Sequence, residues 1–522
     1  MKSLFALSEK SLVALCRMLP ILLVLPFVLT PSARAQLLQL NQTQMPEWAW
    51  TGGSNIASPT RGPGQPGVYG TQYVFADSNA PGSRLSSVTW TDQIGRLWLF
   101  GGVGFDSAAK EGQLNDLWVF DSSRGAYGEW AWMGGSNVAN SPASYGVEYQ
   151  FAASNTPGAR ESSVAWTDSN GKLWLLGGFG QDASGTNEGD LSDLWVFDPA
   201  QGTYGQWAWM GGNNTASEDP IGPPGIYGTQ YQFAPANIPG ARDSAVTWTD
   251  PSGRLWLFGG VGYDSAGAIG DLNDLWMFDA NLGAHGEWAW MGGSDTASPN
   301  LIGPPGVYGT EYQFAATNTP GARDSAVTWT TPDGRLWLFG GSGFDSLGID
   351  GYLNDLWAFD PSRGSNGEWA WMGGSNTVPS LSDGQPGVYG TKYQFSPSNA
   401  PGGRYSGVTW TDNNGRLWLL GGDLQNDLWV FDPCQGPHGE WAWMGGSNTD
   451  AQPGVYGTEH RFALSNTPGA RTWAVSWTDL SGKPWVFGGL GDDSAGNFGL
   501  LNDLWELKVP QGLRLHLCRV SH

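Results

Sequence analysis

The sequence predicts an all-β fold in which one unit of antiparallel strands is repeated along the chain. Each unit contains four short apolar runs bounded by Gly, Asp, Asn or Pro, and no stretch after residue 45 has a sustained helical period. WAW elements recur at intervals of roughly 80 residues. Their leading tryptophans are Trp48, Trp130, Trp207, Trp288, Trp369 and Trp441.

The strands are clearest in the unit from Pro239 to Gly293. We expect strands at Asp243–Trp248, Arg254–Phe258, Asp274–Phe278 and Glu287–Met291. The turn TDPSGR between the first two suits a tight hairpin, because its glycine can adopt a positive φ. The unit is therefore a four-stranded antiparallel meander.

A double glycine follows the second strand of every unit. The pairs are Gly101 and Gly102, Gly177 and Gly178, Gly259 and Gly260, Gly340 and Gly341, Gly421 and Gly422, and Gly488 and Gly489. A meander repeated at fixed period, with this glycine pair, is typical of a propeller blade. The predicted fold is a six-bladed β-propeller.

An NDLW or SDLW element marks the third strand of each unit. Its tryptophans are Trp118, Trp195, Trp276, Trp357, Trp429 and Trp505. Together with the double glycines, this pattern resembles the kelch repeat, and the chain is similar to secreted bacterial kelch-repeat proteins. Galactose oxidase shares this propeller, but its copper site needs clustered histidines and a tyrosine linked to cysteine. The five histidines here form no such cluster in sequence, so we expect no copper site.

The tryptophan count predicts how the ring closes. Five tryptophans per blade account for all but one of the 31, provided that Trp48 and Trp50 complete the pair missing after Trp505. The segment 46–53 is then the fourth strand of the last blade, and its pairing removes the free edges of an open ring.

The predicted organisation has four parts. Residues 1–35 resemble a signal peptide, with Lys2, Lys10 and Arg17 before an apolar run and cleavage before Gln36, which implies a secreted, periplasmic or cell-surface protein. A linker (36–45), the propeller (46–508) and a tail (509–522) follow. We number the predicted blades as repeats 1 to 6, near residues 81–135, 157–212, 239–293, 320–374, 401–446 and 468–508.

Charge and cysteine content narrow the function classes. The net charge of −23 argues against nucleic acid as a partner. Nothing in the mature chain is apolar enough to insert in a membrane, and we expect a monomer. Cys434 and Cys518 are the cysteines left after signal cleavage, and the alternatives are a disulfide that pins the tail or two free thiols.

Calcium and arginine sites each have an architectural alternative. The DS-x-G loops after the second strands, such as Asp264-Ser265, either hold calcium or form turns that satisfy the loop backbone, and we favour the turn. The arginine before each first strand either grips an anion or pairs with the Asp of NDLW or SDLW, and we favour the pair. These arginines are Arg84, Arg160, Arg242, Arg323, Arg404 and Arg471.

A binding site is expected where the repeat is broken. The long loops share one face with a mouth of the central channel, which is the default place for a ligand. Trp473 is the tryptophan outside the register and replaces a serine of the other repeats. It is either a stacking platform for a sugar or simple packing. Arg471, His460 and Arg461 belong to the same irregular patch and complete the candidate ligand-binding set.

The sequence favours a binding or scaffold module that recognises an unknown protein or glycan on its long-loop face, with no catalytic residue, resident metal or cofactor. The alternative is a carbohydrate-active enzyme, of the mutarotase, epimerase or oxidase kind, at the channel mouth. An enzyme requires an asymmetric polar cluster with perturbed acids in one pocket, whereas a binding module does not.

Overall fold

The fold of the described residues is all-β and contains no helix. The structure is a computed structural model that describes residues 45–58, 64–216, 222–297, 303–379 and 384–509. The predicted signal peptide and the tail from residue 510 lie outside these ranges. No helix in the described ranges is long and apolar enough to span a membrane.

Each repeat forms antiparallel sheets, two in repeats 1 and 3 and one in each of the others, and the innermost strand lies at the VTWT or a related element. These inner strands are β3 (Val88–Thr91), β10 (Val164–Thr167), β15 (Val246–Thr249), β22 (Val327–Thr330), β26 (Val408–Thr411) and β31 (Val475–Thr478). A two-residue strand precedes most of them: β2 (Arg84–Leu85), β9 (Arg160–Glu161), β14 (Arg242–Asp243), β21 (Arg323–Asp324) and β30 (Arg471–Thr472).

The second and third strands form the buried middle of each sheet. The second strands are β4 (Leu97–Phe100) with β5 (Val103–Phe105), β11 (Leu173–Gln181), β16 (Leu255–Phe258) with β17 (Val261–Tyr263), β23 (Leu336–Phe344), β27 (Leu417–Gly422) and β32 (Pro484–Asp492). The third strands are β6 (Glu111–Gln113) with β7 (Leu117–Asp121), β12 (Glu188–Asp198), β18 (Ile269–Asp271) with β19 (Leu275–Asp279), β24 (Asp350–Asp360), β28 (Gln425–Asp432) and β33 (Phe498–Lys508).

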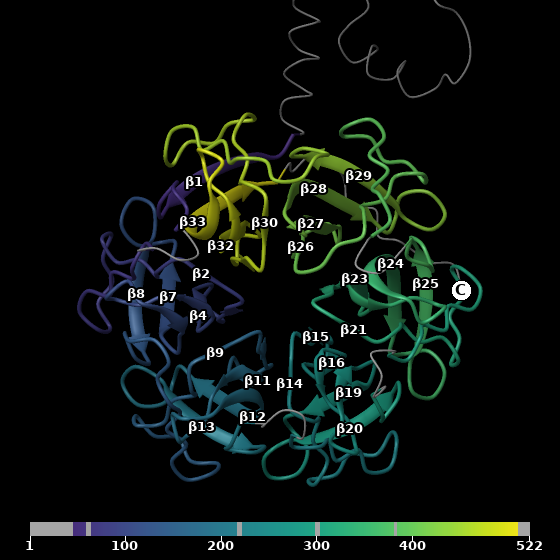
Figure 1. Ribbon diagram of the computed structural model, residues 1–522, viewed down its shortest axis with the longest axis horizontal. Helices are drawn as coiled ribbons and strands as arrows, with labels where there is room; N and C mark the ends of the chain where they lie inside the picture. The colour runs from purple at the N-terminus through teal and green to yellow at the C-terminus, as the bar shows by residue number, and fades with distance from the viewer. Residues whose placement is uncertain (1–44, 59–63, 217–221, 298–302, 380–383, 510–522) are drawn as a thin grey trace, which may run out of the picture. The chain divides into compact units, whose positions relative to one another are not determined.

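The outer strands carry the WAW elements. They are β8 (Glu129–Gly134), β13 (Gln206–Gly211), β20 (Glu287–Gly292), β25 (Glu368–Gly373), β29 (Glu440–Gly445) and, at the start of the described chain, β1 (Glu47–Gly52). β1 pairs antiparallel with β33, in a sheet with the order β1-β33-β32-β30. Figure 1 shows the sheets arranged around a ring, with purple β1 beside yellow β33. The prediction of an all-β chain of four-stranded antiparallel sheets is confirmed, and these are the sheets of a β-propeller.

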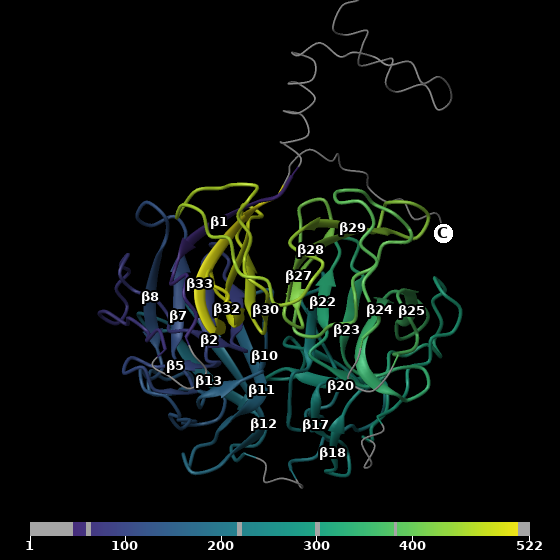
Figure 2. The ribbon, with the colours of Figure 1, turned by 45° about the horizontal axis from the view of Figure 1, so that its top comes forward.

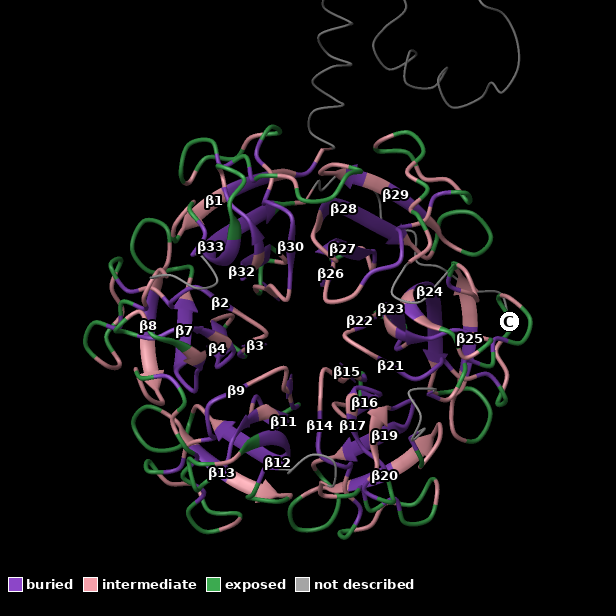
Figure 3. Ribbon diagram, viewed as in Figure 1, coloured by how far each residue is buried: buried purple, intermediate pink, exposed green. Residues whose placement is uncertain are grey.

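The core lies between neighbouring sheets. One cluster joins Trp248 and Phe258 of repeat 3 to Leu336 and Trp357 of repeat 4, and equivalent clusters occur at the other junctions. The strands are mostly buried and the outer loops exposed (Figure 3). The β17–β18 hairpin lies at the lower edge of the ring in Figure 2.

The double glycines mark the contact between successive repeats. Gly259 and Gly260 have φ values of 65° and 93°. A Cβ on Gly259 would lie 2.6 Å from the carbonyl oxygen of Arg323 in the next repeat, and the Gly260 N–H donates to that oxygen at 2.9 Å. A side chain at either position would therefore be strained and would separate the repeats.

Candidate functional site

The arginine that precedes each inner strand is buried in an ion pair inside its own repeat. Arg242 donates from Nη1 and Nη2 to the two carboxylate oxygens of Asp274, both at 2.7 Å. The same carboxylate accepts the Tyr227 hydroxyl at 2.7 Å and the Trp276 indole N–H at 2.7 Å. The bidentate pairs are Arg84–Asp116, Arg160–Asp193, Arg242–Asp274, Arg323–Asp355, Arg404–Asp427 and Arg471–Asp503.

These pairs favour the architectural interpretation of the arginines, including Arg471. Its guanidinium is 1% exposed, donates to both oxygens of Asp503 and also donates to the carbonyls of Gly469 and Gly488. The structure therefore gives Arg471 no role in holding a ligand.

His460 lies at the outer side of its sheet. Its backbone N–H donates to the carbonyl of Trp50 in β1 at 2.7 Å, and its imidazole ring stacks on Tyr127 with centroids 3.5 Å apart. Equivalent stacks join Tyr149 to His285 and Tyr312 to His438. The stack on Tyr127 is thus a repeated contact between repeats.

The predicted ligand-binding patch does not form one site. Arg461 is exposed beside His460, whereas Trp473 precedes the innermost strand of the same sheet. His460 and Arg461 lie next to outer strand β1, so the width of the sheet separates them from Trp473. Of the predicted set, Trp473 is the residue that reaches the centre of the ring.

Trp473 is one member of a closed cycle of backbone hydrogen bonds, which we call the axial ring. Each member donates its N–H to the carbonyl of the member in the preceding repeat, over distances of 2.7–3.2 Å. All six have φ between 51° and 54°, a conformation that is uncommon for side-chain-bearing residues and strained for a tryptophan. The members are Ser86, Ser162, Ser244, Ser325, Ser406 and Trp473.

A cavity of about 160 Å³ is lined by the axial ring and the residues that follow it. Trp473 is its one aromatic lining residue; the others are small, apart from Val246. The indole also contacts the ring of Tyr405, with centroids 5.6 Å apart. Trp473 therefore makes one side of an otherwise serine-lined cavity aromatic.

The residue just before each axial-ring member differs in chemical kind from repeat to repeat, and this difference makes the mouth of the central channel asymmetric. We call these six the rim positions, and their side chains are of different kinds although the repeats are otherwise closely alike. They are Leu85, Glu161, Asp243, Asp324, Tyr405 and Thr472. Three successive repeats thus place carboxylates at the rim, and the others place apolar, aromatic or hydroxyl groups there.

Further carboxylates reach the acidic half of the rim from the third strands. Asp190 is in register with Phe179, which is in register with Glu161. Asp271 is related to Asp243 through Val261 in the same way. Residues in register across strands share a face of the sheet, so these carboxylates gather on one side of the mouth.

Burial and mutual repulsion keep protons on these acids. Burial, together with the charges of Asp243 and Glu188, raises the pKa of Glu161 to about 7. Burial also raises the pKa of Asp324 to about 7, and neighbouring carboxylates including Asp271 add to this. The pKa of Asp271 itself rises to about 6 for the same reasons, with Asp350 as its strongest charged neighbour. These groups change charge close to neutral pH.

Two of the acids are in direct contact. Burial raises the pKa of Asp243, and hydrogen bonds with Ser244 and Asp190 partly oppose that rise. Asp190 is therefore a near neighbour of Asp243. This pair lies within the acidic half of the mouth.

The opposite half of the rim contains an unpaired donor. Thr472 is 1% exposed, and its hydroxyl has no hydrogen-bond partner in the structure. It occupies in repeat 6 the position that Asp243 and Asp324 hold in repeats 3 and 4, so its side chain belongs to the same rim. Leu490, in register with Thr472, makes this half apolar.

Sequence reasoning identified Trp473 but missed the acids. The signal was present in the rim positions, where residue type changes from repeat to repeat within a fixed frame of arginine before and serine after. The expectation that binding residues lie where the repeat is broken applies to these positions as well as to Trp473.

In the DS-x-G loops the aspartate side chain accepts hydrogen bonds from backbone N–H groups. In repeat 3, Asp264 Oδ1 accepts the N–H groups of Ala266 and Ala268 at 2.8 and 2.9 Å, and Oδ2 accepts that of Ala297 at 2.8 Å. These contacts favour the turn interpretation over calcium. Within the described ranges, no group of three or more His, Cys, Asp or Glu side chains could hold a metal ion.

Cys434 lies in the loop after β28 and is disulfide-bonded. Its predicted partner, Cys518, lies outside the described residues. The pairing of these two cysteines therefore stays a prediction.

Comparisons with known proteins find matches among solved structures alone. No family model matches it, and neither does any curated protein. The solved structure described as "Structure of YjhT" covers 84% of this chain and 95% of its own, with 13% identity and a TM-score of 0.43. One described as "Novel fungal alcohol oxidase with catalytic diversity among the AA5 family, in complex with copper" covers 81% of this chain and 62% of its own, with 13% identity and a TM-score of 0.40. At such scores neither likeness supports an argument about function.

Proposed function

We propose that the chain is an exported, monomeric six-bladed propeller of the kelch type, closed by β1 as the fourth strand of the last blade. The register supports this closure, because Trp50 faces Trp505 as Trp290 faces Trp276 inside repeat 3. The cycle of the axial ring also runs from repeat 6 back to repeat 1, through the bond from Ser86 N–H to the Trp473 carbonyl. The composition of residues 1–35 supports export.

The proposed function is recognition of a cationic group at the acidic mouth of the channel. The observation that carries it is the arc of half-buried carboxylates at Glu161, Asp243, Asp271 and Asp324, whose pKa values rise through loss of hydration and, for Glu161, Asp271 and Asp324, through the charges of neighbouring carboxylates. A protonated amine placed among them would relieve this repulsion. Trp473 and Tyr405 on the other side offer aromatic faces, which attract cations and pack on an apolar body.

This proposal keeps the binding-module class and specifies the chemistry of its ligand. A protonated amine occurs both on amino sugars and on lysine side chains of proteins.

Calorimetric titration would test the proposal with chitosan oligosaccharides, their fully N-acetylated counterparts and a lysine-rich peptide. We expect one of the amine-bearing probes to bind and the acetylated sugar to bind at least about tenfold more weakly, because acetylation removes the charge. Asp243→Asn should weaken binding, and Asp77→Asn, which changes an exposed acid between β1 and β2, should not. Equal binding of free and acetylated sugars would refute the cation.

A second candidate function is acid–base chemistry on a carbohydrate, favoured by the neighbouring carboxyl groups of Asp190 and Asp243, since burial raises the pKa of Asp243. Carboxyl groups with a pKa near neutrality, as at Glu161 and Asp324, can donate and accept protons at neutral pH. The acidic mouth meets the requirement of an asymmetric cluster of perturbed acids. NMR of sugar anomers and aryl glycosides mixed with the protein would reveal turnover, which Asp243→Asn should abolish. Cation binding without turnover would contradict the enzyme and support the binding module.

A further inference from the structure

Three aromatic side chains from successive repeats lie side by side at the mouth, and we call them the aromatic arc. They are Tyr352 in β24, Tyr405 at the rim of repeat 5 and Trp473 in the axial ring. The ring centroids of Tyr352 and Tyr405 are 4.9 Å apart, and those of Tyr405 and Trp473 are 5.6 Å apart. All three side chains are partly exposed, so each keeps aromatic surface that a ligand can contact.

The aromatic arc adjoins the acidic half of the rim at repeat 4. Asp324 in β21 is in register with Ser342 in β23, which is in register with Tyr352 in β24. Residues in register across strands share a face of the sheet, so Asp324 and Tyr352 belong to the same face. Burial and the charges of Asp423 and Asp324 raise the pKa of Tyr405 to about 12. Carboxylates and aromatic rings are therefore neighbours at this part of the mouth.

The repeat in the middle of the arc lacks a hairpin that the other repeats have. In those repeats the second and third strands extend beyond the double glycine as a hairpin, as β17 and β18 do in repeat 3. In repeat 5, Asp423 and Leu424 join β27 directly to β28. The Asp423 N–H donates to the Tyr405 carbonyl at 3.2 Å, which places this turn beside the arc. A ligand on the arc therefore meets a short turn of repeat 5 in place of a hairpin.

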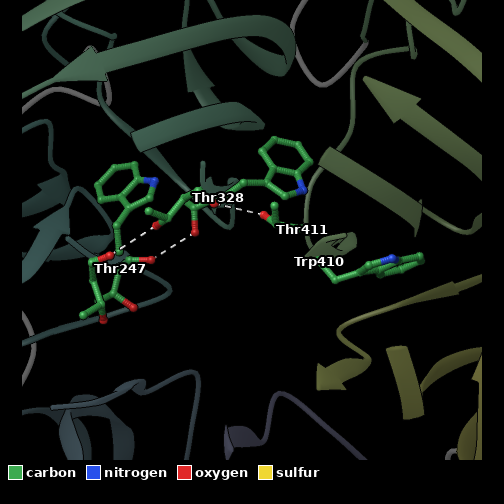
Figure 4. Close-up of a pocket in the computed structure, with 8 residues that line it drawn as sticks. Thr247, Thr328, Trp410 and Thr411 are labelled. Atoms are coloured by element: carbon green, nitrogen blue, oxygen red, sulfur yellow. Dashed lines mark hydrogen bonds between the residues drawn. The ribbon is translucent and has the colours of Figure 1, made fainter. Parts of the chain in front are cut away.

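A larger cavity of about 340 Å³ lies on the inner strands β15, β22 and β26 but offers no such surface (Figure 4). The tryptophans that line it are at most 5% exposed. Trp329 donates its indole N–H to the Trp418 carbonyl at 2.9 Å, and the Trp410 ring packs on the Trp418 ring. Thr328 Oγ1 donates to the Thr247 carbonyl at 3.0 Å (Figure 4). The rings of this cavity are thus packed between the sheets, and its hydroxyl hydrogens are used within the wall.

We propose that the aromatic arc packs the pyranose ring of an amino sugar whose ammonium group lies against Asp324, so that the mouth binds amino sugars more tightly than lysine side chains. This inference rests on the proposed recognition of a cation and specifies its source. The C–H groups of a pyranose pack on the negative faces of aromatic rings. The hydroxyl groups of Tyr352 and Tyr405 can donate to and accept from sugar hydroxyls. A lysine side chain brings the ammonium group but no ring.

Three small probes separate the charge from the ring in calorimetric titrations of the full chain. Methyl glucosaminide has both, its N-acetylated counterpart has the ring without the charge, and Nα-acetyl-lysine amide has the charge without the ring. We expect methyl glucosaminide to bind at least about tenfold more tightly than either of the others, because it alone satisfies the carboxylates and the aromatic arc together.

Trp473→Ser tests the arc without a new kind of residue, because serine occupies this position in the other five repeats and Trp473 has a φ of 53°. It should weaken binding of methyl glucosaminide by about tenfold and that of the lysine amide by less than about threefold. Tyr405→Thr, which uses the rim residue of repeat 6, should also weaken binding of the sugar.

Tyr231→His is the matched control. Tyr231 is an exposed aromatic residue of the variable segment before repeat 3, and it occupies there the position that His460 has before repeat 6. Because Tyr231 lies beside an outer strand and not at the mouth, this variant should bind every probe as the wild type does.

The lysine probe separates failure of this inference from failure of the proposed function. Equal affinities for methyl glucosaminide and the lysine amide, both lowered by Asp243→Asn and neither by Trp473→Ser, would overturn the role of the aromatic arc and keep the cation site. Tighter binding of the lysine amide would do the same. Equal binding of the glucosaminide and its N-acetylated counterpart, or no binding of any probe, would overturn both.

Discussion

At the scale of single residues, the aspartate of each NDLW or SDLW element joins three side chains that are distant in sequence. Asp274 accepts from Arg242, Tyr227 and Trp276, and burial raises the pKa of Tyr227 far above its usual range, so the tyrosine acts only as a donor. The tyrosine comes from the variable segment between repeats. That segment is therefore attached to the sheet at a defined point.

Removing Arg242 should leave a buried charge without its partner. We expect Arg242→Met to lower the free energy of unfolding by about 3–5 kcal/mol, measured by urea denaturation. Replacing Asp274 as well should give no recovery, because Tyr227 and Trp276 would then lose their acceptor. Arg124→Met is the control: Arg124 pairs with Asp121 at the surface and is half exposed, so the loss should stay below about 1 kcal/mol. Similar losses in both variants would contradict the structure.

The raised pKa of Glu161 should appear as a dependence of stability on pH. A carboxyl group whose pKa is higher in the folded state holds more protons there, so the folded state loses stability as pH rises. For Glu161 the loss begins near its ordinary value and is complete above about 7. Thermal unfolding of Glu161→Gln should show a higher Tm than the wild type at pH 8 and little difference at pH 4. A higher Tm for the wild type at pH 8 would mean that Glu161 is paired and not repelled.

At the scale of the elements, β1 is held by a strand that is far away in sequence, because it pairs with β33 near the other end of the described chain. Trp48 packs edge-on against Trp505 with centroids 6.4 Å apart, and Trp288 packs against Trp276 with the same separation. The contacts of β1 thus match those of an outer strand that is continuous with its own repeat.

Two alanine variants compare these strands. If β1 completes the last blade, Trp48→Ala and Trp288→Ala should each cost about 3–5 kcal/mol, since both side chains are 4% exposed. Chemical unfolding measures both losses. A much smaller cost for Trp48→Ala would show that β1 is an appendage and that the ring is stable without it.

The strands were predictable because the residues that signal each one lie close together in the sequence. The turn residues and the apolar runs identify most strands within a residue or two at each end: Arg254–Phe258 was expected, and β16 spans Leu255–Phe258. The first strand, expected at Asp243–Trp248, is instead divided into β14 and β15 (Val246–Thr249). The tryptophan count also pointed to Trp48 and Trp50 as the missing outer strand, which the structure pairs with β33.

The acidic mouth could not be found in this way. Glu161 and Asp243 belong to different repeats, and their proximity follows from how the repeats pack. A change at a single rim position also leaves every strand pattern intact. The unpaired indole N–H of Trp410 could not be predicted from the sequence at all, since Trp410 and Trp329 stand in the same VTWT motif. Side-chain orientation decides that difference.

At the scale of the whole molecule, asymmetry of charge is concentrated at the rim positions, which occupy equivalent places in the repeats. The sheets, ion pairs and glycine contacts repeat, and they hold the axial ring and the rim in fixed geometry. Variation at the rim then changes the charge of the mouth without disturbing the sheets. The net charge of −23 adds a long-range field of the same sign, which favours the approach of cations.

If an amine binds at the acidic mouth, its affinity should depend on pH through the protein and not through the ligand. The side-chain amines of the lysine-rich peptide stay protonated below about pH 9, whereas Glu161 and Asp324 lose their protons near 7 and Asp271 near 6. Affinity for the amine probe found by calorimetry should therefore rise between pH 5 and pH 8, and binding at pH 6.5 should release protons. Titrations in two buffers of different ionisation enthalpy measure that release. The double variant Glu161→Gln, Asp324→Asn should release fewer protons and show a flatter profile, while Asp77→Asn should behave as the wild type. An affinity independent of pH would place the amine away from these carboxylates.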